Sequence, residues 1–340
     1  MSRRDSADLG TLRHHGDDDA LPGLVDLAVN VRAGTPPAWL LDRLRAVDLA
    51  RYPQQDAALK AVAERHGRSP DEVLLTAGAA EAFVLLARAL QPRRPVVIHP
   101  QFTEPEIALR DAGADVRRVI LRAPFRLDAD AVPDDADLVV LGNPTNPTSV
   151  AHPRAVIRAL LRPDRLVVVD EAFADCVLGE TESVAADPDV VVVRSLTKTW
   201  GLAGVRAGYV LAPAEVVARL RRAQAHWPVN ALALEACVAC SAPAAVAEAG
   251  AWAEELVADR AHLAALLAAL PGVAVCPDAQ ASFLLVRTEL VSPWAGLRER
   301  GFAVRRADTF PGLSAHWFRV AVRDGATSTA FARALEETLR

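Results

Sequence analysis

The segment DVVVVRSLTKTWGLAGVRAGYV, residues 189–210, has four consecutive valines after Asp189 and then places a lysine, Lys198, a few residues beyond them. A continuous β-branched run without polar alternation predicts a strand that is buried on both faces of a parallel sheet. Similar runs recur along the chain, at 95–100, 137–144 and 165–172. The segment therefore indicates one member of a set of parallel strands, with reactive side chains at its end.

Helical patterns separate these strands. The candidate helices cover residues 81–91, 104–113 and 153–161. This alternation predicts an α/β fold with a mostly parallel central sheet and helices on both faces, over residues 46–245.

The last hundred residues have a different pattern. A long amphipathic helix is expected at 251–270 and a closing helix at the C-terminus. Three candidate strands lie between these helices, at 281–288, 301–307 and 316–323. We therefore expect a smaller α+β domain made of residues 1–45 and 246–340.

Composition excludes several functional classes. The 340 residues are 51% hydrophobic and 24% charged, and the net charge is −5, so no basic nucleic-acid surface is expected. No apolar run reaches the ~18–20 residues of a membrane span, and the N-terminus does not resemble a signal peptide. Cys237 and Cys240 form a CxxC without a second ligand pair, so no metal site is predicted. We expect a cytoplasmic protein without nucleic-acid or membrane partners.

Polar and aromatic residues follow the predicted strands at their carboxyl ends. These residues are Phe102, Asn146, Asp170, Ser195 and Lys198. In open α/β sheets, ligands bind beyond the carboxyl ends of the strands. Taken singly, a strand-end Asp is often a cap and a lone Lys is usually a surface residue. Their convergence on consecutive strands indicates a functional site.

One chemistry requires this combination of residues. A lysine at an apolar strand end can form a Schiff base with the aldehyde of pyridoxal 5′-phosphate. This cofactor needs a carboxylate against its pyridine nitrogen, a role that suits Asp170. Phe102 can stack on the ring, and Asn146 can donate to the phenolic oxygen.

The cofactor phosphate needs hydroxyls, a cation and a helix N-terminus. Ser195 and Arg206 supply the first two, and the turn at 76–83 supplies the third. The small residues there let backbone N–H groups approach a phosphate. The predicted contacts in this turn are Gly78, Ala79, Ala80 and Glu81.

Three motifs resemble those of the class I/II aminotransferases, which are fold-type I pyridoxal-phosphate enzymes. SLTKTWGLAGVRAGY (195–209) is similar to their lysine motif, NPTNPTS (143–149) to their asparagine motif and VVVDEAF (167–173) to their aspartate motif. The resemblance implies that Lys198 binds the cofactor and that Asp170 contacts its ring.

Two further segments extend the resemblance. RYPQQD (51–56) resembles a segment whose tyrosine reaches the cofactor phosphate of the neighbouring subunit, which implies this role for Tyr52 and a homodimer with shared sites. HWFRVAV (316–322) resembles the strand whose arginine holds the substrate carboxylate, which implies that role for Arg319.

Two subgroups of the family compete. RSLTK (194–198) and the segment 14–37 resemble the L-threonine-O-3-phosphate decarboxylases of cobalamin biosynthesis, which implies that His15, Gly16 and Asn30 lie near the substrate. We therefore expect a decarboxylase, with a histidinol-phosphate-type aminotransferase as the alternative. Both would act on a phosphorylated amino compound. The residues do not fix which bond at the substrate Cα breaks.

Several positions depart from the family pattern. Asp17 replaces a glycine, and Arg32 and Ala33 stand where the family has Asn-Pro. Arg32 is either a new phosphate ligand or a loop residue. Ser149 replaces a glycine, so its turn is expected to form without a positive φ. The two remaining departures are Pro105 and Ser282, in place of a tyrosine and an asparagine.

Two other functional classes fit the sequence less well. A cofactor-binding regulator without turnover usually carries a DNA-binding module, and we see no room for a helix-turn-helix before residue 46. A nucleotide-binding dehydrogenase would need a GxGxxG after a strand, which we do not find.

Overall fold

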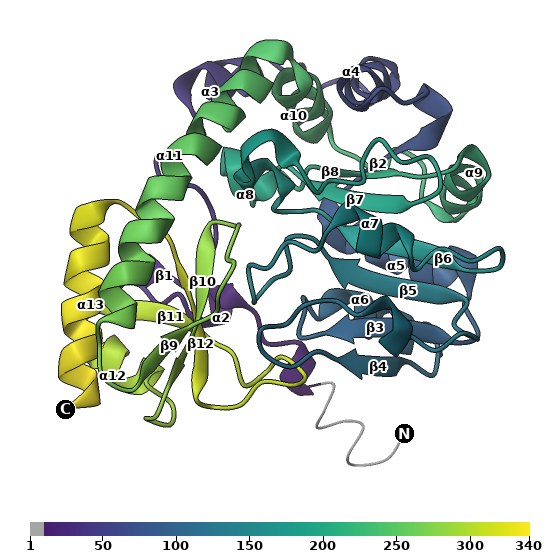
Figure 1. Ribbon diagram of the computed structural model, residues 1–340. Coiled ribbons are helices and arrows are strands. Elements are labelled where there is room, and N and C mark those ends of the chain that lie inside the picture. Colours follow the sequence, from purple (N-terminus) through teal and green to yellow (C-terminus); the bar gives the residue numbers. More distant parts are fainter. Residues whose placement is uncertain (1–9) are drawn as a thin grey trace.

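The computed structural model describes residues 10–340 and contains a seven-stranded sheet in the order β2-β8-β7-β6-β5-β3-β4 (Figure 1). All neighbouring strands pair in parallel except at β8, which runs antiparallel to both β2 and β7. The strands are β2 Val73–Thr76, β3 Pro95–His99, β4 Arg117–Ile120, β5 Leu138–Gly142, β6 Leu166–Asp170, β7 Val191–Ser195 and β8 Gly208–Leu211.

Helices cover both faces of this sheet, as the continuous apolar runs predict. Every residue of β3, β5 and β7 is buried. One face packs against α5 Gly78–Leu90, α6 Glu104–Asp111 and α9 Ala214–Ala223. The other face packs against α3 Ala38–Arg45, α4 Asp56–His66, α7 Arg154–Arg158 and α10 Ala231–Ser241.

A second sheet of five strands has the order β1-β11-β12-β10-β9. Its strands are β1 Val25–Leu27, β9 Val273–Val275, β10 Phe283–Thr288, β11 Phe302–Arg306 and β12 Trp317–Ala321. It packs against α11 Pro243–Ala268 and α13 Gly325–Leu339, and α12 Trp294–Glu299 precedes β11. β1 pairs in parallel with β11, so the N-terminal segment joins this sheet.

Residues 10–340 also contain shorter elements. Two four-residue helices are α2 Gly16–Asp19 and α8 Thr197–Trp200. Four 3₁₀ turns cover Pro70–Glu72, Ala129–Ala131, Ala174–Cys176 and Leu178–Glu180. Helix α11 extends from α10, beside the large sheet, to α13, beside the small one (Figure 1).

The predicted α/β class is confirmed. The division into two domains at residues 46 and 245 stays a prediction, and residues 1–9 of the predicted small domain lie outside the described residues. The expected helix at 251–270 begins earlier, at Pro243, because a proline at the first helical position is compatible with helix initiation.

Within residues 10–340, no single helix has the length and hydropathy to cross a membrane. Helices α10 and α11 reach those values only as a pair, with a bend of 74° between them. Seven residues of α10 are buried, and most of them lie in the core against the large sheet.

Candidate active site

A cavity of about 530 Å³ lies at the carboxyl ends of β5, β6 and β7, between the two sheets. Residues of β11, β12 and the N-terminal segment close its other side. Most of the residues predicted for the site line it. They are His15, Gly16, Asn30, Ala79, Ala80, Phe102, Asn146, Asp170, Ser195, Lys198, Arg206 and Arg319. The roles of these residues toward cofactor and substrate stay predictions.

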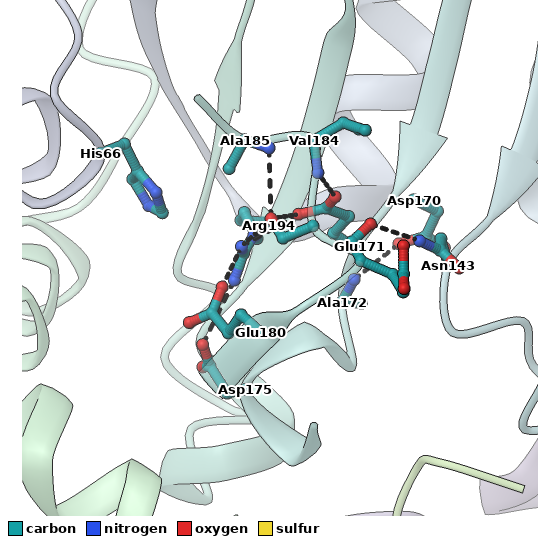
Figure 2. A network of polar contacts seen from close by, with 12 residues as sticks. His66, Asn143, Asp170, Glu171, Ala172, Asp175, Glu180, Val184, Ala185 and Arg194 are labelled. Atoms are coloured by element: carbon teal, nitrogen blue, oxygen red, sulfur yellow. Dashed lines mark hydrogen bonds and ion pairs between the residues drawn. The ribbon is translucent and has the colours of Figure 1, made fainter. Parts of the chain in front are cut away.

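Asp170 and Lys198 follow from two neighbouring parallel strands, Asp170 at the end of β6 and Lys198 in the short helix α8 just after β7. Asp170 is the last residue of β6 and its side chain accepts a hydrogen bond from the Ala172 amide at 3.0 Å (Figure 2). Burial raises the pKa of this carboxyl to about 6, against the opposing effects of the Ala172 amide and Lys198. Burial and the charge of Arg319 lower the pKa of Lys198 to about 8.

Two glycines shape the part of the cavity next to the start of helix α5. Helix α5 begins at Gly78, whose φ is +77°, and a Cβ there would lie 2.7 Å from Arg206 Nη2. A Cβ on Gly208 would lie 2.9 Å from the Gly78 carbonyl carbon. Side chains at these positions would fill the space where the first amides of α5 and Arg206 meet. We call this space, between the first amides of α5 and Arg206, the α5 cradle. With Ser195 beside it, the α5 cradle fits a phosphate group.

The Glu81 side chain points away from this cradle. Its carboxylate turns back to accept the Ala77 amide at 2.5 Å, and it lies 3.5 Å from Gln224 Nε2. A glutamate in the first turn is drawn to the free N–H groups of its own helix. Glu81 therefore caps α5 and does not line the cavity. Gly78 does not line it either, and contributes through its backbone conformation.

Aromatic and amide side chains flank the lysine. Phe102 lines the cavity, with its ring centroid 5.6 Å from that of His15. Phe173 lies below Lys198, whose Nζ is 5.8 Å from the ring centroid. Asn146 Oδ1 accepts a hydrogen bond from Arg319 Nη1 at 2.5 Å, so its amide nitrogen keeps its donor capacity for a ligand. A flat ring with a polar oxygen fits between these groups.

Arg319 is held firmly in a buried position. It donates to the carbonyl of Ala28 and to Asn146 Oδ1. With the Asn30 amide oriented so that its oxygen faces the guanidinium, Arg319 also donates to Asn30 Oδ1 at 3.0 and 3.2 Å. Burial and the charge of Arg305 lower the pKa of Arg319 to about 9. A cation whose charged form is disfavoured in this way gains from an anionic ligand.

Sequence reasoning missed a second buried arginine, Arg305 of β11. It lines the cavity and donates to the His14 carbonyl at 2.6 Å and to Thr309 Oγ1 at 2.7 Å. Burial lowers its pKa to about 10, although Asp19 lies 3.6 Å away. Its place at the end of a predicted strand, 301–307, was a signal that could have revealed it.

Other residues missed as site members also face the cavity. Glu104 Oε1 lies 2.7 Å from His15 Nε2, so an acidic group sits beside the predicted substrate contact. The remaining missed lining residues are Asp17, Val29, Val31, Ala172, Phe173, Thr197, Ala203 and Phe310.

Besides Gly78 and Glu81, two further predicted residues, Arg32 and Tyr52, do not line the cavity. Arg32 Nη1 is 3.5 Å from Glu248 Oε1, and the guanidinium lies over the Trp252 ring, so it is not placed as a phosphate ligand. Tyr52 is 70% exposed and stacks on Trp227 with ring centroids 4.5 Å apart. Its contact with a partner subunit stays a prediction.

Ser149 overturns the expectation of a turn without positive φ. Its φ is +65°. The hydroxyl accepts the Ala281 amide at 2.8 Å and its carbonyl accepts the Gln280 amide at 2.7 Å. These bonds tie the asparagine motif to the start of β10 and stabilise a conformation that glycine would adopt more easily.

A buried charge network lies behind Asp170 (Figure 2). Arg194 contacts Glu171 at 2.9 Å and Asp175 at 3.3 Å, and also pairs with Glu180. Desolvation opposes ionisation of Glu180, but the charges of Arg194 and Arg65 lower its pKa to about 2. The network holds the chain that follows Asp170 against β7.

This fold and this site define a pyridoxal-phosphate-dependent enzyme of fold type I. The profile of the family described as "Aminotransferase class I and II" matches residues 22–336, and the chain belongs to this family. The enzyme class and the cofactor, pyridoxal 5′-phosphate, are as predicted.

Relatives carry two different names. A histidinol-phosphate aminotransferase of Mycobacterium tuberculosis is 52% identical, with 94% of this chain and 89% of the relative covered. A threonine-phosphate decarboxylase of Salmonella typhimurium is 32% identical, with 93% and 91% covered. The structure of a histidinol-phosphate aminotransferase from Clostridium acetobutylicum superposes with a TM-score of 0.83 at 24% identity, over 92% of this chain and 98% of that one, which shows the shared fold.

Proposed function

We propose that this protein is an aminotransferase that acts on a phosphorylated amino compound of the histidinol-phosphate type. The observation that carries the proposal is the 52% identity to a histidinol-phosphate aminotransferase over 94% of the chain, against 32% to a threonine-phosphate decarboxylase. This reverses the preference drawn from residues 194–198 and 14–37. The lysine turn serves the cofactor in either reaction, so it discriminates poorly between them.

Decarboxylation of a phosphorylated amino acid is the second candidate. It is supported by the N-terminal segment, whose resemblance to the decarboxylases first favoured that reaction. His15, Gly16 and Asp17 of that segment line the cavity. Both candidates require a dianion site beside the cofactor.

The charges of the cavity support a phosphorylated substrate. Arg305 and Arg319 lie on the side away from the α5 cradle, and burial and neighbouring cations lower the pKa of each. A dianion bound between them would offset the free-energy cost of burying two positive charges and would form charge-assisted hydrogen bonds. Although the whole chain carries a charge of −5, its cavity is therefore built for an anion.

The cofactor fits the residues that are present. Lys198 would hold its aldehyde carbon, Asp170 its pyridine nitrogen, and the α5 cradle with Ser195 and Arg206 its phosphate. Bound pyridoxal phosphate supplies an electron sink that stabilises negative charge at the substrate Cα. The protein must then orient the substrate and move one proton.

Lys198 is suited to that proton transfer. With a pKa lowered to about 8, its Nζ is neutral in an appreciable fraction of molecules near neutral pH and can accept the Cα proton. Asp170, with a pKa of about 6, is ionised over the same range. Arg319 orients the substrate from β12, and the neighbouring Asn30 and Asn146 fix its guanidinium.

We also propose a cytoplasmic homodimer with shared sites. The exposed, stacked pair Tyr52 and Trp227 supports this assembly, because a contiguous exposed apolar patch marks an interaction site. Sedimentation of the cofactor-loaded protein would give twice the chain mass. A fully active species of single-chain mass would refute it.

The decisive experiment offers two substrates to the cofactor-loaded protein. Histidinol phosphate with 2-oxoglutarate should yield glutamate, and L-threonine phosphate alone should yield no carbon dioxide. Carbon dioxide without glutamate would establish the second candidate. Bound cofactor with neither product would match a regulator without turnover and would refute both.

A substitution of Arg305 tests the dianion site. Arg305→Gln should raise KM for the phosphorylated substrate by roughly 10- to 100-fold, as expected for the loss of a charge-assisted bond. Its effect on an unphosphorylated analogue should be much smaller. An equal effect on both compounds would remove Arg305 from phosphate binding.

A further inference from the structure

The segment around Arg32 reaches the backbone of the lysine-bearing turn. The Arg32 amide donates to the Lys198 carbonyl at 2.9 Å. Helix α8 has only four residues, and the amides of Gly201 and Leu202 that follow it both bond to the Thr197 carbonyl. The Lys198 carbonyl is one of the acceptors that a helix C-terminus leaves without an internal partner. Arg32 supplies the donor from outside the helix.

The same segment packs tightly on the end of α8. Thr35 Oγ1 donates to the Arg32 carbonyl at 2.6 Å, which fixes a compact turn. A Cβ on Gly201, whose φ is +67°, would lie 2.5 Å from Thr35 Oγ1. The ring of Trp39 meets the buried Trp200 edge-on, with centroids 5.6 Å apart. The end of the lysine turn is therefore seated against the segment 32–39.

Glu248 of helix α11 holds this segment from the other side. Its Oε1 lies 3.5 Å from Arg32 Nη1, and its Oε2 accepts the Trp39 indole N–H at 2.8 Å. The Arg32 guanidinium also lies 5.3 Å from the Trp252 ring centroid, one turn further along α11. The side chains of Arg32 and Glu248 are only 20% and 35% exposed, so water screens this pair less than a surface ion pair.

We propose that Arg32 and Glu248 form a clamp that positions Lys198 through its backbone, with Arg32 as a positioning residue and not a ligand of substrate or cofactor. The clamp links α11, which passes beside both sheets, to the turn that carries the lysine (Figure 1). Arg32 stands where the family pattern has another residue. The inference rests on the predicted role of Lys198 in holding the cofactor.

The first test measures the clamp without reference to substrate. Amide hydrogen exchange of residues 29–35 is followed in the cofactor-free protein, for the wild type and for Arg32→Gln and Glu248→Gln. Each variant should exchange roughly 3- to 10-fold faster in this segment, because it opens locally more often. Arg43→Gln is the matched control, since it removes an ion pair of 2.6 Å with Glu235 that does not involve α8. Unchanged exchange in both variants would overturn the proposal.

The second test separates positioning from ligand binding. In the cofactor-loaded enzyme, Arg32→Gln should lower kcat roughly 2- to 10-fold and weaken pyridoxal-phosphate binding by a similar factor, with KM for the amino substrate unchanged. Arg32→Lys, which keeps the charge, should recover part of both losses. The double variant with Glu248→Gln should lose no more than either single variant, because both remove one coupled contact.

Two results would contradict the clamp. A rise in KM for the phosphorylated substrate with normal exchange would make Arg32 a substrate ligand. Additive losses in the double variant would show that Arg32 and Glu248 act separately. If the enzyme has a different substrate from the one proposed, the exchange result still stands, so failure of the proposed function and failure of the clamp are distinguishable.

Discussion

Replacing Asp170 by asparagine should stabilise the cofactor-free protein while it impairs the enzyme. Burial raises the pKa of Asp170 from 3.8 to about 6. The folded chain therefore binds this proton more tightly than the unfolded chain. The stability from this proton is fully present below pH 3.8 and is lost as the pH rises through about 6. Above that pH, an ionised Asp170 opposes folding.

The size of the effect follows from the two pKa values. The two pKa values differ by about 2, and a pKa difference of one corresponds to about 1.4 kcal/mol. The ionised carboxylate therefore lowers the free energy of unfolding by about 3 kcal/mol at pH 7.5 and by about half of that at pH 5. Asn is neutral, has nearly the same shape and can still accept the Ala172 amide. Asp170→Asn should therefore raise the free energy of unfolding by up to about 3 kcal/mol at pH 7.5, and by clearly less at pH 5.

Urea unfolding of the cofactor-free protein at both pH values measures this difference. Asp42→Asn is the matched control, because Asp42 is exposed and pairs with Arg45 on the same helix. It should change stability by less than about 0.5 kcal/mol at either pH. In the cofactor-loaded enzyme, Asp170→Asn should reduce turnover by roughly 100-fold or more, since the charge that faces the cofactor ring is lost.

Two outcomes would refute this reasoning. Equal destabilisation of Asp170→Asn at pH 5 and pH 7.5 would show that burial of its charge does not oppose folding. Near-normal turnover would show that Asp170 does not face the cofactor ring. The prediction links stability to function. A carboxylate whose buried charge lowers the stability of the cofactor-free protein is well placed to contact a cationic partner.

Three other substitutions test separate parts of the site. Lys198→Ala should abolish cofactor that can be trapped covalently with borohydride; persistent trapping would assign the bond to another lysine. Ser149→Ala should lower the free energy of unfolding by about 1–2 kcal/mol, since the buried Ala281 amide loses its acceptor, and urea unfolding against the wild type measures it. Mixing inactive Lys198→Ala with an inactive Tyr52→Ala variant should restore part of the activity in a homodimer with shared sites, whereas no recovery would argue for separate sites.

The sequence predicted the large sheet well where its strands are continuous and apolar. The valines of β5, β6 and β7 are buried on both faces, so their pattern has a single structural solution. Parallel pairing then brings the strand ends together, with Gly142 opposite Asp170 and Asp170 opposite Val193. The positions of Asp170 and Lys198 in the cavity follow from those strands alone.

Short and half-exposed strands left no such signal. β1 has three residues and only Leu27 among them is buried, so no alternation could be recognised. β8, Gly208–Leu211, overlaps only the end of the lysine motif, and nothing in its four residues shows that it runs antiparallel to both neighbours. Tertiary pairing, not local preference, determines these strands.

The two arginines whose roles were misjudged show where sequence reasoning ends. Arg32 is an unexpected cation in a candidate loop, whereas Arg305 lies inside a predicted strand, at 301–307. Arg32 meets a carboxylate 216 residues away, and Arg305 reaches the His14 carbonyl 291 residues away. Whether an arginine faces a ligand or a protein carboxylate depends on such distant contacts, which local pattern does not encode. An arginine can bind the substrate only where the fold buries it beside a cavity and nearby carboxylates do not fully offset the loss of its hydration. Arg305 is in this position.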